Sequence, residues 1–175
     1  MTNTKINRLK SLLMLKLFLL LLLVNSCNYS FKGASPPDGI KTIFIPTVKD
    51  ESGFGAANLA EDITLLLKNK FIKDNTLEYA DKISADGMLS CTIKSVKDEA
   101  LVVSEGEQVS KRKITISVSV EFQNLKKQKN IWVKDFSNWG EYESSSGGFS
   151  QRDLGISSAT DKITDDILLE VISNW

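Results

Sequence analysis

The stretch ITISVSVEF, residues Ile114–Phe122, alternates apolar and polar side chains without a break. Side chains of a strand point alternately to the two faces of its sheet. One face of this strand would therefore carry only Ile114, Ile116, Val118, Val120 and Phe122. The other face would carry Thr115, Ser117, Ser119 and Glu121. The pattern predicts a strand of an antiparallel sheet with one face buried and the other in contact with water.

The neighbouring segments extend this strand into a meander. Residues 87–103 predict a preceding arm with apolar residues at positions 89, 91 and 93, and residues 104–108 predict the hairpin tip. After the strand, the basic turn NLKKQKN leads to a third arm over residues 131–142. The facing of that arm stays open, because two apolar pairs compete for the buried side: Ile131 with Val133, and Trp132 with Phe136.

Two helices complete the predicted fold. IKTIFIPTV, residues 40–48, predicts a strand that ends near Pro46. A helix follows, with Asn58 as its predicted N-cap and Glu61 placed as in a capping box. The last helix spans about residues 151–173, where Gly155 predicts a frayed first turn. The apolar stripes of the two helices are Leu59, Ala60, Ile63, Leu66, Leu67 and Phe71 in the first, and Ala159, Ile163, Ile167, Leu168, Val171, Ile172 and Trp175 in the second.

The order of elements is therefore β-α-β-β-β-α. The simplest arrangement is an α+β fold in which two helices pack on one face of a mostly antiparallel four-stranded sheet. The other, polar face of the sheet is then left for solvent or a partner. We expect a single domain over residues 40–175.

The N-terminal segment has the features of a secretory leader. Basic residues precede the apolar run at residues 17–24, which is too short to cross a bilayer. The tetrad Val24-Asn25-Ser26-Cys27 resembles a bacterial lipobox. It predicts a cleaved leader over residues 1–26 and a lipidated tether over residues 27–39. The alternatives are an ordinary leader, or a short buried helix with a chance cysteine.

The lipobox resemblance implies diacylglycerol on the Cys27 sulfur and a further acyl chain on the new amine, a combination that gives stable membrane anchoring. The chain has only two cysteines, so Cys91 would have no disulfide partner if Cys27 is lipidated. The position of Cys91 in an alternating strand predicts a small buried apolar residue.

Composition argues against an enzyme and against a nucleic-acid partner. The chain contains no histidine, which removes Ser-His-Asp and Cys-His catalysis and most zinc sites. The paired acids at 61–62, 141/143 and 165–166 are expected to be solvated, and GFGAAN lacks the spacing of a phosphate loop. Basic and acidic residues balance at 22 each, so no global attraction to nucleic acid is expected. We predict no cofactor and no metal site.

Two basic clusters are candidate ligand contacts. Lys111, Arg112 and Lys113 lie near the hairpin tip, and Lys126, Lys127 and Lys129 lie in the next turn. The meander places these clusters at opposite ends of the sheet. They are either solvated charges that discourage aggregation or contacts for the phosphates of lipid head groups.

Several stretches together resemble the LptE family of lipopolysaccharide-assembly lipoproteins, in its Bacteroidetes-type form. Besides the lipobox and IKTIFIPTV, these stretches are RKITISVSVEFQN (112–124), DFSNWGEYESS (135–145) and DDILLEVISNW (165–175). The resemblance covers nearly the whole mature chain and rests on order and spacing. It implies two helices packed on a four-stranded sheet, which agrees with the fold predicted from the residues.

The resemblance also implies a non-enzymatic role at the outer membrane. Members of the family plug the LptD β-barrel, assist its assembly and help lipopolysaccharide reach the outer leaflet. The six basic residues above are our candidates for contact with that glycolipid. The alternative is a CsgG- or LpoB-like periplasmic lipoprotein, which forms a secretion pore or activates a cell-wall synthase, because IKTIFIPTVKDESG followed by a helix is also similar to that group.

Overall fold

The structure is a computed structural model that describes residues 37, 39–104, 108–144 and 149–173. The predicted leader, the predicted anchor Cys27 and most of the tether lie outside the described residues, as does the centre of the hairpin tip. The elements follow in the order β1 (Thr42–Phe44), β2 (Lys49–Asp50), α2 (Leu59–Asp74), β3 (Glu78–Tyr79), β4 (Gly87–Ser104), β5 (Gln108–Asn124), β6 (Lys129–Glu143) and α3 (Phe149–Ser173).

These strands form one mixed sheet of six strands in the order β3-β1-β4-β5-β6, with β2 also paired to β4. The pairs β4–β5 and β5–β6 are antiparallel, as the meander predicts, whereas β1 pairs parallel with β3 and β4. The prediction of an α+β fold is confirmed, but the sheet has more strands than the four expected. A helical crossover such as α2 returns the chain to the same end of the sheet, so β1 and β4 run parallel.

The alternation in β5 is confirmed. Its five apolar side chains from Ile114 to Phe122 are at most 1% exposed. They lie opposite residues of β4 that are also buried, for example Cys91 opposite Val120 and Leu89 opposite Phe122. Burial of each large side chain stabilises the domain by roughly 1.5–3 kcal/mol. The predicted burial of Cys91 is also confirmed, and burial raises the pKa of its thiol to about 12.

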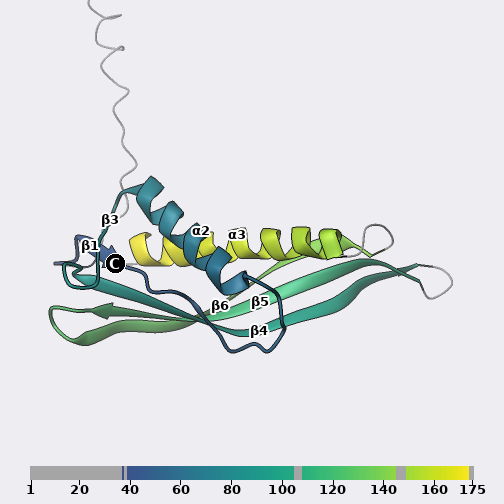
Figure 1. Ribbon diagram of the computed structural model, residues 1–175, viewed down its shortest axis with the longest axis horizontal. Coiled ribbons are helices and arrows are strands. Elements are labelled where there is room, and N and C mark those ends of the chain that lie inside the picture. The colour runs from purple at the N-terminus through teal and green to yellow at the C-terminus, as the bar shows by residue number, and fades with distance from the viewer. Residues whose placement is uncertain (1–36, 38, 105–107, 145–148, 174–175) are drawn as a thin grey trace, which may run out of the picture. The chain divides into compact units, whose positions relative to one another are not determined.

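Both helices cover the same face of the sheet (Figure 1). Their buried stripes meet the apolar face of β4 and β5 in one core. The residues that reach this core are Leu59, Ile63, Leu67 and Phe71 from α2 and Ala159, Ile163, Ile167 and Val171 from α3. The predicted stripes are therefore confirmed over the described residues, while Trp175 of the second stripe lies outside them.

Asn58 is the N-cap residue of α2, as predicted, but the predicted capping box and the predicted frayed turn at Gly155 are wrong. Asn58 lies in a left-handed conformation (φ 66°), and its side chain makes no capping hydrogen bond. Asparagine tolerates this conformation, and the acids of the first turn complement the helix dipole in place of a capping box. Gly155 lies inside α3 and is buried. A Cβ on Gly140 of β6 would collide with the Gly155 carbonyl, so this glycine pair lets α3 approach the strand closely.

Candidate functional site

The two predicted basic clusters do lie at opposite ends of β5. Lys111 and Lys113 pair in register with the far part of β4, whereas Asn124, just before the other cluster, pairs with Gly87 at its start. Lys113 and Asn124 are roughly 36 Å apart at a rise of about 3.3 Å per residue. No single ligand head group could touch both clusters.

In the first cluster, Arg112 is held by a neighbouring carboxylate. Its Nε donates to Asp98 Oδ1 at 2.8 Å and to Tyr142 Oη at 3.0 Å, and its Nη2 donates to the Asp98 carbonyl oxygen at 3.0 Å. The hydrogen bond with Asp98 raises the pKa of Arg112. Lys111 lies 3.6 Å from Glu143, and Lys113 lies opposite Glu99 and Glu141 in the two neighbouring strands. Acidic neighbours therefore surround this cluster.

Asp98 is the centre of a polar network that the sequence did not reveal. Tyr142 Oη donates to Asp98 Oδ2 at 2.8 Å, and Arg152 Nε of α3 lies 3.3 Å from the same oxygen. The Arg152 guanidinium also stacks over the Phe54 ring at 4.3 Å. Desolvation is the main cause that raises the pKa of Tyr142. This network joins β4, β5, β6 and α3 at one end of the domain.

In the second cluster, Lys126 is likewise committed to a carboxylate. It forms an ion pair with the buried Asp86. Asp86 Oδ2 also accepts the backbone N–H groups of Lys41 (2.8 Å) and Thr42 (3.2 Å). The hydrogen bond with Lys126, followed by the backbone bonds, lowers the pKa of Asp86 to about 2. Asp86 thus fastens the start of β1 to the β5–β6 turn.

Lys127 and Lys129 remain exposed at the same turn. The Lys127 backbone N–H donates to Asn124 Oδ1 at 2.8 Å, which shapes the turn. Neither ammonium forms an ion pair with a described residue. Of the six candidate contacts, these two therefore have the ammonium groups that are most accessible to a ligand.

The face of the sheet opposite the helices is mostly polar and uncovered within the described domain, with Val133 of β6 as an exposed apolar residue on it. Thr115, Ser117 and Ser119 lie half-buried along β5, and Ser117 Oγ lies 3.1 Å from Ser137 Oγ of β6.

The register between β5 and β6 shows which side of the third arm faces the core. Trp132 and Phe136 lie opposite Phe122 and Val118 on the core side, so the third arm also contributes to the core. A hollow of about 280 Å³ opens on the polar face beside β2.

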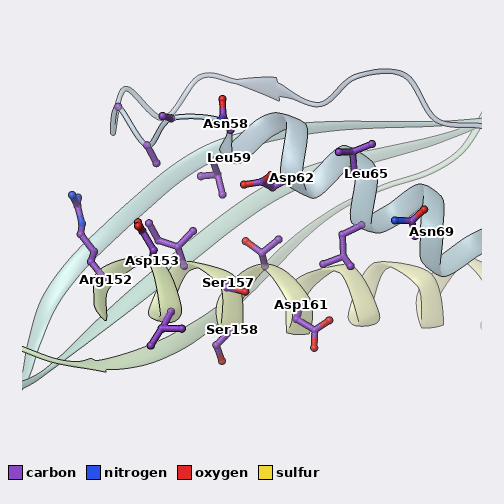
Figure 2. Close-up of a pocket in the computed structure, with 17 residues that line it drawn as sticks. Asn58, Leu59, Asp62, Leu65, Asn69, Arg152, Asp153, Ser157, Ser158 and Asp161 are labelled. Atoms are coloured by element: carbon purple, nitrogen blue, oxygen red, sulfur yellow. The ribbon is translucent and has the colours of Figure 1, made fainter. Parts of the chain in front are cut away.

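A larger groove, of about 1110 Å³, lies between α2 and α3 (Figure 2). Its walls are the first turns of the two helices and the loop before α2. The apolar members of its lining include Leu59, Leu65, Leu66, Leu154 and Ile156, and its acidic members are Asp62, Asp153 and Asp161.

Neither of the helices that the structure describes combines the length and hydropathy needed to cross a membrane. Across the same residues, no group of three or more cysteines or acids is placed to hold a metal ion. Glu143, one of the paired acids, lies in an ion pair with Lys111.

Several solved bacterial structures have a similar fold. The hypothetical protein CT253 from Chlamydia trachomatis matches with a TM-score of 0.57 and 11% identity, over 75% of this chain and 95% of that one. The PelC dodecamer from Paraburkholderia phytofirmans matches with a TM-score of 0.53 and 11% identity, over 79% of this chain and 94% of that one. Rare lipoprotein B from Shewanella oneidensis matches with a TM-score of 0.51 and 12% identity, over 73% of this chain and 92% of that one. At such low identity these likenesses show the fold alone.

Comparison with curated proteins finds no match. Comparison with family models does: the model LptE, described as lipopolysaccharide-assembly, matches residues 40–171. This range contains the whole sheet and nearly all of α3. The match supports the resemblance to LptE over the CsgG- or LpoB-like alternative. The chain therefore belongs to the LptE family of lipopolysaccharide-assembly proteins.

Proposed function

We propose that this protein is an outer-membrane lipoprotein that sits as a plug in an LptD-type β-barrel, assists assembly of that barrel and helps lipopolysaccharide pass to the outer leaflet. The observation that carries the proposal is the family match over residues 40–171. The lipid anchor would be Cys27, carrying diacylglycerol and an N-acyl chain such as palmitate. The folded domain would then face the periplasm or the barrel lumen.

The polar face of the sheet supports a place inside a barrel. The lumen of a large barrel is wet, because the polar residues of its strands point inward. A plug needs a surface that tolerates both water and polar side chains, and the row from Thr115 to Ser119 is such a surface. We propose that this face meets the inner wall of the barrel.

The second basic cluster supports direct contact with the glycolipid. Lysine forms charge-assisted hydrogen bonds with phosphate. Lys127 and Lys129 are exposed and without ion pairs among the described residues, whereas Lys126 and Arg112 are held by Asp86 and Asp98. We therefore rank Lys127 and Lys129 first among the six candidates, followed by Lys111 and Lys113.

The proposed role is non-enzymatic and needs no cofactor. The protein would act by occupying space, by stabilising the folded barrel and by presenting charge. The chain has no histidine and no recognisable phosphate loop. These features support a binding role.

A depletion experiment tests the proposal. Cells depleted of this protein are complemented with the wild-type gene or with Cys27→Ala, and mature barrel and surface lipopolysaccharide are measured. We expect depletion to lower both quantities, the wild type to restore them and Cys27→Ala to fail. Unchanged barrel and lipopolysaccharide after depletion would contradict the plug role. Full rescue by Cys27→Ala would contradict the lipid anchor at Cys27 but not the plug role.

A further inference from the structure

The groove between α2 and α3 has an apolar lining that is open to solvent. Leu65 of α2 is 52% exposed and Leu154 of α3 is 60% exposed, and both line it together with the half-buried Leu66 and Ile156. At the other end, Lys70 joins the helices through Asp161 (2.8 Å) and Asp165 (2.5 Å). Contiguous apolar surface framed by polar residues is typical of an interaction site.

A buried hydroxyl in the same lining has no partner. Thr160 is 4% exposed, and its Oγ1 makes no hydrogen bond with any described residue. Thr164, one turn later, does have one: its Oγ1 donates to the Thr160 carbonyl oxygen at 2.8 Å. A buried hydroxyl left without a partner costs about 1–3 kcal/mol. This points to an occupant that brings a hydrogen-bonding group as well as apolar surface.

Two exposed carboxylates of the groove, Asp62 and Asp153, are uncompensated, whereas the other charged lining residues, Asp161 and Arg152, are paired with Lys70 and Asp98. Asp62 and Asp153 are exposed, and neither lies in an ion pair with a described residue. Most basic side chains of the two helices are engaged by other groups of the chain: Lys68 lies over the Tyr79 ring, Lys70 pairs with Asp161 and Asp165, Arg152 pairs with Asp98, and Lys162 lies over the Trp139 ring. Such a rim repels phosphate and attracts lysine or arginine.

We propose that this groove docks a basic amphipathic helix of a partner protein. Apolar side chains of that helix would cover Leu65 and Leu154, and its lysine or arginine side chains would pair with Asp62 and Asp153. From Leu59 to Asn69 the groove is about 15 Å long at 1.5 Å per residue, which suits a helix of about three turns. Docking of one apolar helix face into a groove is an established mode of recognition.

This inference goes beyond the proposed function and does not depend on it. The acidic rim disfavours the anionic glycolipid at this surface, and the polar face proposed to meet the barrel wall lies on the opposite side of the sheet. The helix groove would thus serve a second interaction.

Peptide binding tests the chemistry of the groove. The full mature chain in detergent is titrated, with fluorescence anisotropy as readout, against a 14-residue amphipathic helix that carries leucines on one face and lysines beside them. A second peptide has glutamate in place of each lysine. We expect the lysine peptide to bind at least about tenfold more tightly, a difference of 1.4 kcal/mol. Equal binding of the two peptides, or no binding of either, would overturn the proposal.

Matched variants locate the binding. Leu65→Lys with Leu154→Lys adds two positive charges inside the groove and should weaken binding of the lysine peptide at least about tenfold. Ile72→Lys with Leu169→Lys changes two residues on the same helices that are similarly exposed, at 57% and 54%, but lie outside the lining. This control should bind within about twofold of the wild type. Thermal melting of both variants checks that each one is folded. An equal loss in both would overturn the assignment to this groove.

Photo-crosslinking in cells tests the natural occupant. A photoreactive amino acid replaces Leu65 or, as control, Ile72 in the full chain, and the crosslinked segment is mapped by mass spectrometry. We expect position 65, and not position 72, to crosslink to a segment of another protein that reads as a basic amphipathic helix. Crosslinks to lipopolysaccharide, to a second copy of this chain or to an acidic segment, or no crosslink at all, would overturn the proposal.

Discussion

Tyr142 and Asp98 are hydrogen-bonded across an intervening strand. Tyr142 lies on β6 and Asp98 on β4, and the phenol donates to the carboxylate at 2.8 Å over Arg112 of β5. The contact ties the three long strands together at the end of the sheet that carries the first basic cluster. Arg112 therefore has a structural role, whatever ligand the neighbouring lysines meet.

Removal of the Asp98 charge should destabilise the domain. Asp98→Asn leaves Arg112 and Arg152 without their carboxylate, and both arginine side chains are about a third exposed. We expect a loss of about 1–2 kcal/mol, less than the roughly 3–5 kcal/mol for a fully buried pair, because water screens the exposed part. Urea denaturation of the wild type and the variant measures this difference in the free energy of unfolding. Glu99→Gln on the neighbouring exposed residue is the control and should change stability by less than about 0.5 kcal/mol. Similar losses in both variants would contradict this role for Asp98.

Addition of one methyl group at Gly140 should separate α3 from β6. A Cβ there would collide with the Gly155 carbonyl and lie 2.9 Å from Ser158 Cβ. Because these groups belong to a packed helix, Gly140→Ala should cost about 3 kcal/mol, at the upper end for overpacking. The control is Gly53→Ala, where φ is +67° and nothing lies within 4 Å, so only a backbone cost of about 1 kcal/mol is expected. The melting temperatures of the two variants are compared. An equal decrease in both would contradict the close packing of α3 on β6 at Gly140.

The two faces of β5 should respond differently to the same substitution. Val118 is 1% exposed, whereas its neighbour Ser119 is half-buried on the polar face. Val118→Asp buries an unpaired charge and should cost more than about 4 kcal/mol, enough to unfold many domains. Ser119→Asp should leave the domain folded. Circular dichroism during heating distinguishes them, and an unchanged melt for Val118→Asp would mean that the facing of β5 is wrong.

Asp86 should make the domain sensitive to acid. Its pKa is about 2 in the folded domain against an ordinary value of 3.8, so the folded state favours the charged carboxylate. Its contribution, up to about 2 kcal/mol, is complete above pH 4 and is lost as the pH falls through 2. The stability difference between wild type and Asp86→Asn, from urea melts at several pH values, should therefore shrink between pH 4 and 2. A difference that stays constant over this range would argue against the ion pair with Lys126.

The long elements could be predicted because each has a strong period. The alternation from Ile114 to Phe122 and the helical stripe from Ala159 to Val171 each indicate one buried face. The two-residue strand β2 holds too few residues to show a period. The parallel pairing of β1 depends on how α2 crosses the sheet, which local pattern does not encode.

The network around Asp98 could not be predicted, because a bulge changes the phase of β4. Continued from Leu89, Cys91 and Ile93, the alternation would place Asp98 on the polar face. The register shifts between Ile93 and Ser95, so Asp98 lies on the core side opposite Ile114. Because the bulge hides the position of Asp98, the sequence did not show that Arg112 is paired. The ion pair between Lys126 and Asp86 was not expected either, because it joins segments that are distant in the sequence.

The most direct test of the central claim is affinity purification of the tagged protein from detergent-solubilised outer membrane, with quantitative mass spectrometry of its partners. Our account predicts an LptD-type β-barrel in near-equal amount, retained after a salt wash. A cell-wall synthase, a homo-oligomer without a barrel, or no partner would contradict the proposal that this member of the LptE family plugs that barrel.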